Sequence, residues 1–241
     1  FTRKIFKNGM IILHEKRDIP VTTIAFTARV GYGFEHANIK GISHFIEHMA
    51  FKGTANRTAE QISSELESVG GELNAFTSDE LTVFHVKLPS RHLALGVDVL
   101  SDIFFNALMK QDELEKERKV IIEEIKMYHD DPKRYVLDKI KELSYKAPFG
   151  LQGTGTAQTL NSMNQKHLVE FHRKNYIASN SILCVVGNNS FNEVLELAKK
   201  IPVKEGKTIN KISPDGIFEK LVEKRKNIHK FSGMYVNGLK E

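Results

Sequence analysis

The segment His44-Phe45-Ile46-Glu47-His48 constrains this chain more than any other, because it places two imidazoles four residues apart. On a helix, positions i and i+4 lie on one face with their Cβ atoms about 5–6 Å apart, so both rings can bind one metal ion. Glu47 projects about 100° away around the helix and can reach water at that metal. The segment therefore predicts a helix that carries part of a metal site.

Apolar residues surround the two histidines and the glutamate, namely Phe45, Ile46, Met49 and Phe51. Polar side chains in such a stretch are costly to bury unless they are hydrogen bonded or bound to a metal. A solvated helix that carries two histidines by chance is the alternative interpretation, and these apolar neighbours count against it.

A catalytic zinc normally has three protein ligands and one open position, so a further ligand is needed from elsewhere in the chain. Residues 112–128 have the spacing of a helix, with Asp112 and Glu115 resembling its N-terminal cap. Its apolar face repeats through Leu114, Ile121 and Tyr128.

Glu117 and Glu124 fall on that same face, whereas Glu123 points about 100° away and is expected in solvent. We therefore predict Glu124 as the third ligand. Glu117 is predicted to orient a ligand or to assist proton transfer. An ordinary surface carboxylate remains the alternative interpretation for Glu117.

With these residues in place, the sequence resembles the pitrilysin/insulinase family of zinc peptidases, in the branch of the mitochondrial processing peptidase. The inverted order His-x-x-Glu-His is one part of the resemblance. Glu124 follows His48 by 76 residues, and Glu117 precedes Glu124 by seven, as in that family. Further matching stretches are Gly31-Tyr32-Gly33, Phe51-Lys52-Gly53-Thr54, residues 70–77, Asp130-Asp131-Pro132 and Val185-Val186-Gly187-Asn188.

The resemblance implies one zinc ion per chain, held by His44, His48 and Glu124, with Glu47 as the general base. It implies a zinc-dependent endopeptidase that hydrolyses extended or unfolded peptides. A non-catalytic scaffold subunit and a zinc-dependent peptide-binding module are the alternatives. The complete set of metal residues favours the enzyme.

The resemblance also suggests how a peptide would be held. Residues 81–88 alternate like a strand, and the family uses this region as an edge strand that pairs with substrate. Asn74 and Ala75 are expected to contact the substrate backbone, with Phe76 as a further substrate-binding candidate; a plain turn into a core strand is equally compatible. Phe51 matches a position that lines the pocket for the residue after the cleaved bond, although it could also be core.

Composition limits the other function classes. The chain has 241 residues, 41% hydrophobic, a net charge of +5 and a pI near 9.1, but its lysines are spread among glutamates without a nucleic-acid motif. No apolar run approaches the roughly 20 residues of a membrane span. The single cysteine, Cys184, is predicted to be a small core residue. No signal peptide is recognised, and a cytoplasmic location is expected, although residues before Phe1 could have been removed.

Strands, then helices, then strands again predict an α+β fold, a two-layer sandwich with a largely antiparallel mixed sheet and helices on one face. We expect residues 1–200 to form the zinc-binding half-domain and residues 201–241 a polar linker with one possible strand at 231–239. The predicted strands are 10–14, 22–30, 74–88 with a turn or bulge, and 181–186; the predicted helices, besides that of the motif, are 58–69, 90–106, 112–128, 132–143, 165–175 and 191–200.

Full members of the family carry two related halves, and this sequence contains one. No second copy of the motif region is present. Either the chain is a fragment of a longer protein, or the natural enzyme is assembled from separate half-size subunits. In the second case we expect a partner besides the peptide substrate, either a second half-size homologous subunit or a second copy of this chain in a homodimer.

Overall fold

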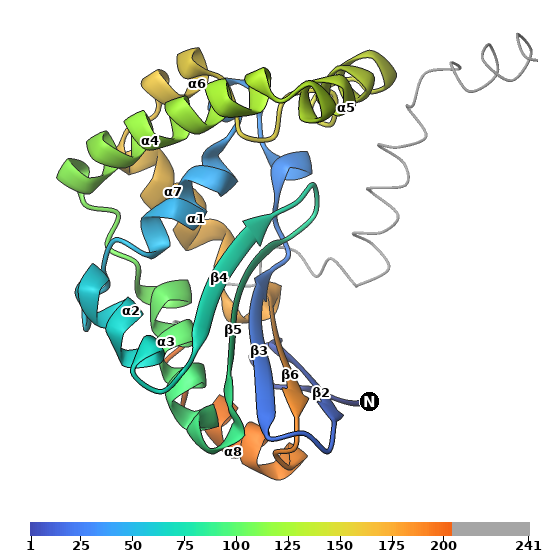
Figure 1. Ribbon diagram of the computed structural model, residues 1–241, viewed down its shortest axis with the longest axis vertical. Helices are drawn as coiled ribbons and strands as arrows, with labels where there is room; N and C mark the ends of the chain where they lie inside the picture. Colours follow the sequence, from blue (N-terminus) through green and yellow to red (C-terminus); the bar gives the residue numbers. More distant parts are fainter. Residues whose placement is uncertain (204–241) are drawn as a thin grey trace, which may run out of the picture.

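The computed structural model describes residues 1–203, which form one open sheet of six strands with helices packed on one face (Figure 1). The strand order is β1-β2-β6-β3-β5-β4, and within residues 1–203 only β2 and β6 pair in parallel. The strands are β1 (Thr2–Ile5), β2 (Ile11–Lys16), β3 (Val21–Ala28), β4 (Glu72–Thr77), β5 (Thr82–Pro89) and β6 (Ser181–Gly187). The predicted two-layer α+β fold is confirmed.

The helices follow the predicted spans within a few residues. They are α1 (Ile42–Ala50), α2 (Ala59–Glu67), α3 (Leu93–Asn106), α4 (Gln111–Asp130), α5 (Pro132–Ser144), α6 (Ala157–Ser162), α7 (Gln165–Asn175) and α8 (Phe191–Lys200). Among the strands and α-helices of the described residues, β1 and α6 were not predicted. All four residues of β1 are exposed, so its pairing with β2 leaves no apolar alternation to recognise, and α6 has only six residues.

The two faces of the sheet differ in burial. Along β6, Leu183 and Val185 are fully buried beneath the helices, while Ile182 and Cys184 are half-buried on the opposite face. Cys184 was predicted to be a core residue, and the structure instead places it on this open face. The main core therefore lies between the sheet and the helices.

The predicted cap of the 112–128 helix is wrong. Helix α4 begins at Gln111 after Lys110, and no side chain caps it among the described residues. Glu115 is engaged elsewhere, because it accepts hydrogen bonds from Gln111 and Arg118. A carboxylate that is already paired along the helix surface does not turn back to the first amides.

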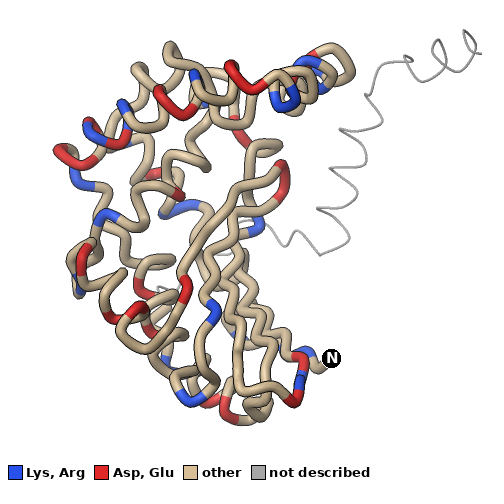
Figure 2. The backbone as a smooth tube through the Cα atoms, viewed as in Figure 1, with Lys and Arg blue, Asp and Glu red and all other residues tan. Residues whose placement is uncertain are grey.

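Helix α5 extends away from the body of the molecule (Figure 1). None of its residues is buried within the described part of the chain, and several apolar side chains on it are more than half exposed, including Leu137 and Leu143. Basic and acidic residues are interspersed along α4 and α5 and are not gathered by sign (Figure 2). No helix among residues 1–203 is both long and apolar enough to cross a bilayer.

The predicted boundary near residue 200 and the predicted strand at 231–239 concern a region that is largely or wholly outside the described residues. The described part ends shortly after α8, at residue 203.

Candidate metal centre

Helix α1 is held by its apolar residues, which are fully buried against α4, α7 and the strands β4 and β5. Ile42, Phe45, Ile46 and Met49 supply this buried face. The same anchoring fixes the polar side chains between them, and His44 is only 7% exposed. The polar residues of the motif are thus partly enclosed, as the apolar neighbours predicted.

The structure brings His44, His48 and Glu124 together from two helices. The Nε2 atoms of His44 and His48 lie 3.7 and 3.4 Å from the same oxygen, Oε2 of Glu124. One donor atom from each of the three residues lies within 4.8 Å of the others. These are the three residues that the spacing of the sequence selected.

This donor set fits a zinc ion. Zinc takes imidazole nitrogen and carboxylate oxygen at about 2.0–2.2 Å, so tetrahedral ligand atoms stand about 3.3 Å apart. The observed separations of 3.4 and 3.7 Å are close to that value. One feature is incomplete, because His44 Nδ1 is buried without a hydrogen-bond partner among the described residues, whereas a metal-binding imidazole usually donates through its other nitrogen.

The surroundings shift the pKa values of the two imidazoles in opposite directions. Burial, together with the neighbouring His48, lowers the pKa of His44 to about 4. Burial would also lower the pKa of His48, but hydrogen bonds with Glu124 and Glu117 outweigh it and raise that pKa. His44 is therefore neutral and ready to bind a cation at neutral pH.

Glu124 is kept ionised. Burial alone would raise its pKa, but hydrogen bonds from His48 and Tyr128 and the charges of the two imidazoles lower it to about 2. Tyr128, one turn later on α4, donates its hydroxyl to Glu124 Oε1. The Arg134 guanidinium lies 3.5 Å from the centre of the Tyr128 ring, so α5 contacts the residue that supports Glu124.

Glu117 is 6% exposed and lies behind His48. Its Oε2 is 3.2 Å from His48 Nδ1, and its Oε1 is 2.6 Å from Lys52 Nζ. The interpretation of Glu117 as an ordinary surface carboxylate is therefore excluded by its position. Glu123, by contrast, is exposed and pairs with Lys126, as predicted for a solvated residue.

Glu47 lies beside the three donors and does not belong to them. Burial raises its pKa, and a hydrogen bond from Thr77 opposes this effect. Thr77, on β4, donates its hydroxyl to Glu47 Oε2 at 2.5 Å. Sequence reasoning missed this contact, because nothing in the local pattern of a strand indicates which helix it will face.

The predicted substrate-binding residues lie on and near β4. Strand β4 is an edge strand, bonded to β5 on one side. Its alternation places the side chains of Asn74 and Phe76 on the open face of the sheet, away from Thr77 and α1. Phe51 is half-buried just after α1, with its ring centre 6.0 Å from that of Phe84.

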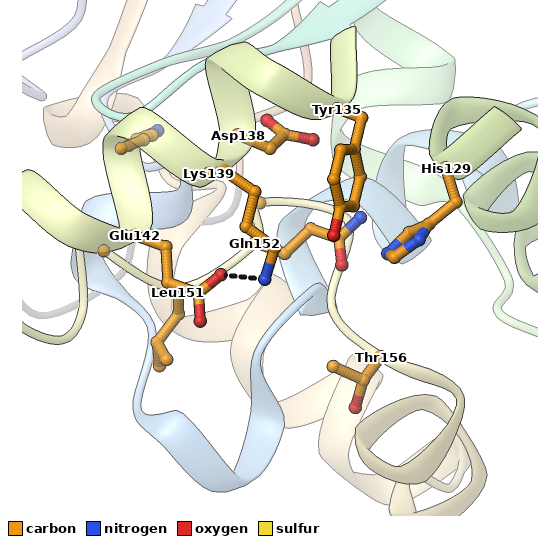
Figure 3. Close-up of a pocket in the computed structure, with 11 residues that line it drawn as sticks. His129, Tyr135, Asp138, Lys139, Glu142, Leu151, Gln152 and Thr156 are labelled. Atoms are coloured by element: carbon orange, nitrogen blue, oxygen red, sulfur yellow. Dashed lines mark hydrogen bonds and ion pairs between the residues drawn. The ribbon is translucent and has the colours of Figure 1, made fainter. Parts of the chain in front are cut away.

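A hollow of about 200 Å³ lies between α5 and the loop of residues 150–156 (Figure 3). Basic and acidic side chains both line it, and on the α5 side Lys139 forms an ion pair of 2.6 Å with Glu142, one turn further along the same helix. None of the three metal-site donors lines it. It is separate from the His-His-Glu cluster.

Comparisons with known proteins point to one family. Residues 10–156 match the family model described as Insulinase (Peptidase family M16). A Bacillus subtilis protein named "Uncharacterized zinc protease YmxG" is 35% identical over 224 residues, which cover 91% of this chain and 54% of that protein. The mitochondrial-processing peptidase subunit beta of Mus musculus is 34% identical over 194 residues, covering 80% of this chain and 40% of the subunit.

Solved structures agree with the fold. A protease from Helicobacter pylori superposes with a TM-score of 0.83 at 25% identity, covering 88% of this chain and 52% of that one. The periplasmic protease PqqL from Escherichia coli superposes with a TM-score of 0.79 at 24% identity, covering 86% of this chain and 24% of PqqL. The chain spans about half the length of the curated relatives that it matches.

Proposed function

This chain belongs to the insulinase family of peptidases, family M16, and we propose that it is the zinc-bearing part of an endopeptidase acting on extended or unfolded peptides. The observation that carries the proposal is the cluster of His44, His48 and Glu124, whose donor atoms lie within 4.8 Å of one another beside Glu47. Relatives named as zinc proteases support the same chemistry.

In this proposal His44, His48 and Glu124 hold the zinc ion. When bound, zinc supplies Lewis acidity, which acidifies water and polarises the scissile carbonyl. Glu47 accepts the proton of the attacking water as the new C–O bond forms. It then gives that proton to the departing amine nitrogen as the C–N bond breaks. Its raised pKa suits a group that must both accept and donate a proton.

The substrate is proposed to pair with the outer edge of β4. The Ala75 N–H donates to the Oδ1 of Asn74, 2.8 Å away, so this amide bonds to a neighbouring side chain rather than to the strand β5. An extended peptide could replace that local bond with a bond from its own carbonyl. Thr77, two residues further along the strand, would connect the bound peptide to Glu47.

The whole active enzyme is proposed to need a second half. The chain spans about half of the relatives it matches, so a homologous half-size subunit, a second copy or a further part of a longer chain would complete the site. Strand β4 forms one wall for the peptide, and the second half would supply the opposite wall. A purely non-catalytic scaffold role is the competing proposal.

The test is hydrolysis of a mixed peptide library by the purified chain, with zinc and with a chelator, reading the cut positions by mass spectrometry. We expect chelator-sensitive cleavage, either by the chain alone if a second copy completes the site or after the second half of a full-length relative is added. Glu47→Gln should still bind zinc but should not hydrolyse, because an amide cannot accept the proton of water. Glu123→Gln, an exposed carboxylate on α4, is the matched control and should behave like the wild type.

Near-normal turnover by Glu47→Gln would refute its role as base. A wild-type chain that binds one zinc but cleaves nothing would be tested again with the second half of a full-length relative. Cleavage restored in that mixture would support the two-half enzyme, whereas continued inactivity would favour the scaffold role.

A further inference from the structure

The start of α1 differs from that of the other capped helices. Its N-cap is Gly41, which adopts a left-handed conformation (φ 95°) and has no side chain to accept the first amides. The N-cap side chains of α2, α5, α6, α7 and α8 supply that acceptor themselves. Because the first amides of any helix need acceptors, those of α1 must be satisfied from outside the helix.

Glu35 provides this acceptor from six residues upstream. Its Oε2 accepts from the Gly41 N–H at 2.9 Å, and its Oε1 accepts from the Ser43 N–H at 2.8 Å. A carboxylate at this position also interacts favourably with the positive end of the helix dipole. The residue after Ser43 is His44, the first of the proposed ligands.

Glu35 is itself held in place by a buried lysine. Glu35 and Lys40 are 3% and 2% exposed, and Lys40 Nζ lies 3.5 Å from Glu35 Oε2. Lys40 also donates to the carbonyl oxygens of Tyr32 at 2.7 Å and Pro148 at 3.1 Å. Burying such a pair costs desolvation energy, so stability alone is a weak reason for its presence.

Residues 154–159 of the same chain pack closely against the start of α1 and restrict its first turn. A Cβ atom on Gly41 would stand 2.4 Å from the Thr154 carbonyl oxygen, and one on Gly155 would stand 2.3 Å from the Lys40 carbonyl oxygen. Thr159 donates its hydroxyl to that same Lys40 oxygen at 2.8 Å. The first turn of α1 is therefore fixed both by Glu35 and by contacts with residues 154–159.

We propose that Glu35, held by Lys40, is a positioning residue for the metal centre. By fixing the first turn of α1, it sets where His44 and His48 present their Nε2 atoms to Glu124. A metal site tolerates shifts of only about 0.5 Å in its ligands, so a loosened first turn would misplace His44. This inference rests on the proposed function, because ligand placement matters only if these residues hold zinc.

The experiment compares Glu35→Gln, Lys40→Met and the double variant. Glutamine keeps the size of Glu35 but offers one acceptor oxygen for two amides. The double variant leaves no unpaired buried charge, so the stability of the metal-free protein should recover toward the wild type. Its zinc affinity, measured by chelator competition where every variant is folded, should remain about tenfold or more below the wild type.

Asp102→Asn is the matched control, because Asp102 is also a buried carboxylate, 4% exposed, that accepts from Thr54, Asn56 and Arg57. It joins α3 to the turn after α1 and does not touch the first turn. It should lower stability while leaving the zinc affinity unchanged.

A second measurement does not depend on zinc. Amide hydrogen exchange over residues 41–45 of the metal-free protein should quicken at least tenfold in Glu35→Gln and in the double variant, but not in Asp102→Asn. Wild-type zinc affinity and wild-type exchange in the double variant would overturn the positioning role. A wild-type protein that binds no zinc would instead count against the proposed function, while the exchange data would still test the role of Glu35 in α1.

Discussion

At the scale of single residues, Glu117 binds a different side chain with each of its two carboxylate oxygens. One oxygen contacts His48 Nδ1 and the other contacts Lys52 Nζ. His48 can therefore donate through Nδ1 to Glu117, while its Nε2, which faces Glu124, is the atom that would bind the metal. The lysine holds the carboxylate in the orientation that this hydrogen bond requires.

Glu117→Gln should weaken zinc binding about tenfold, because it removes the charge that makes His48 a stronger ligand. The measurement is competition with a chelator of known affinity. Glu123→Gln, on the same helix but exposed, is the control and should bind zinc like the wild type. Equal affinities in the two variants would show that Glu117 does not support the metal.

The buried His44 predicts a pH dependence for the metal-free protein. Its pKa is about 4 when folded and about 6.5 when unfolded. Between these values the unfolded state binds more protons, so stability falls as the pH falls from about 6.5 toward 4. His48 has a raised pKa, so its contribution to stability is lost as the pH rises above about 6.5. Glu124 has a lowered pKa, so its contribution to stability is lost as the pH falls below about 4.5.

His44→Gln should therefore flatten the fall in stability between pH 6.5 and pH 5. The wild type should lose about 1–2 kcal/mol more than the variant over this interval. Urea unfolding of both proteins in the presence of a chelator measures it. Parallel losses in the two proteins would mean that His44 is not neutral in the folded state.

At the scale of elements, β4 combines a free edge with a contact to the motif helix. Ala75 gives its N–H to Asn74 Oδ1, and Thr77 gives its hydroxyl to Glu47. An exposed edge of this kind invites pairing with another chain unless something blunts it, and the Asn74 side chain does so here.

Ala75→Pro tests whether this edge binds the peptide. Proline removes the N–H that bonds to Asn74, and the ladder to β5 does not use that N–H. We expect a higher KM, by about tenfold for the loss of one main-chain hydrogen bond of roughly 1–1.5 kcal/mol, with zinc binding kept. Ala75→Ser, which retains the N–H, is the control. An unchanged KM in a folded Ala75→Pro protein would contradict pairing at this edge.

At the scale of the whole molecule, the three proposed zinc ligands all come from this one chain. A bound peptide, by contrast, would be contacted by this chain on one side only. The sheet edge and α1 form that side, and the chain spans about half of its matched relatives. Metal binding and peptide turnover should therefore be separable properties.

The purified chain should bind one zinc ion per molecule without any partner. Elemental analysis after dialysis measures the ratio, and His48→Ala should reduce it to near zero because one of three ligands is lost. The double substitution of the exposed pair Glu123→Gln and Lys126→Met on α4 is a control that should keep the ratio at one. A wild-type chain that acquires zinc only after a second half is added would show that the site is incomplete in this chain.

Much of this protein was determined by local sequence. The repeat of apolar residues marks each long helix, the alternation of β6 marks a strand, and the spacing of His44 and His48 places two donors on one helical face. Glu124 was found because a carboxylate on an apolar stripe needs a partner. These signals act over one or two turns, where the period of the backbone decides which side chains share a face.

Only the tertiary structure decided the partners that support those residues. Thr77 reaches Glu47, Lys52 reaches Glu117, and Glu35 completes a helix whose own cap is a glycine. The first two contacts join segments 30 or more residues apart, and the third is tied through Lys40 to Pro148. Such contacts depend on how α1 packs between β4 and α4, which no local period specifies. The three proposed metal ligands could thus be predicted from the sequence. The hydrogen bonds and ion pairs that hold the site in place could be seen only in the tertiary structure.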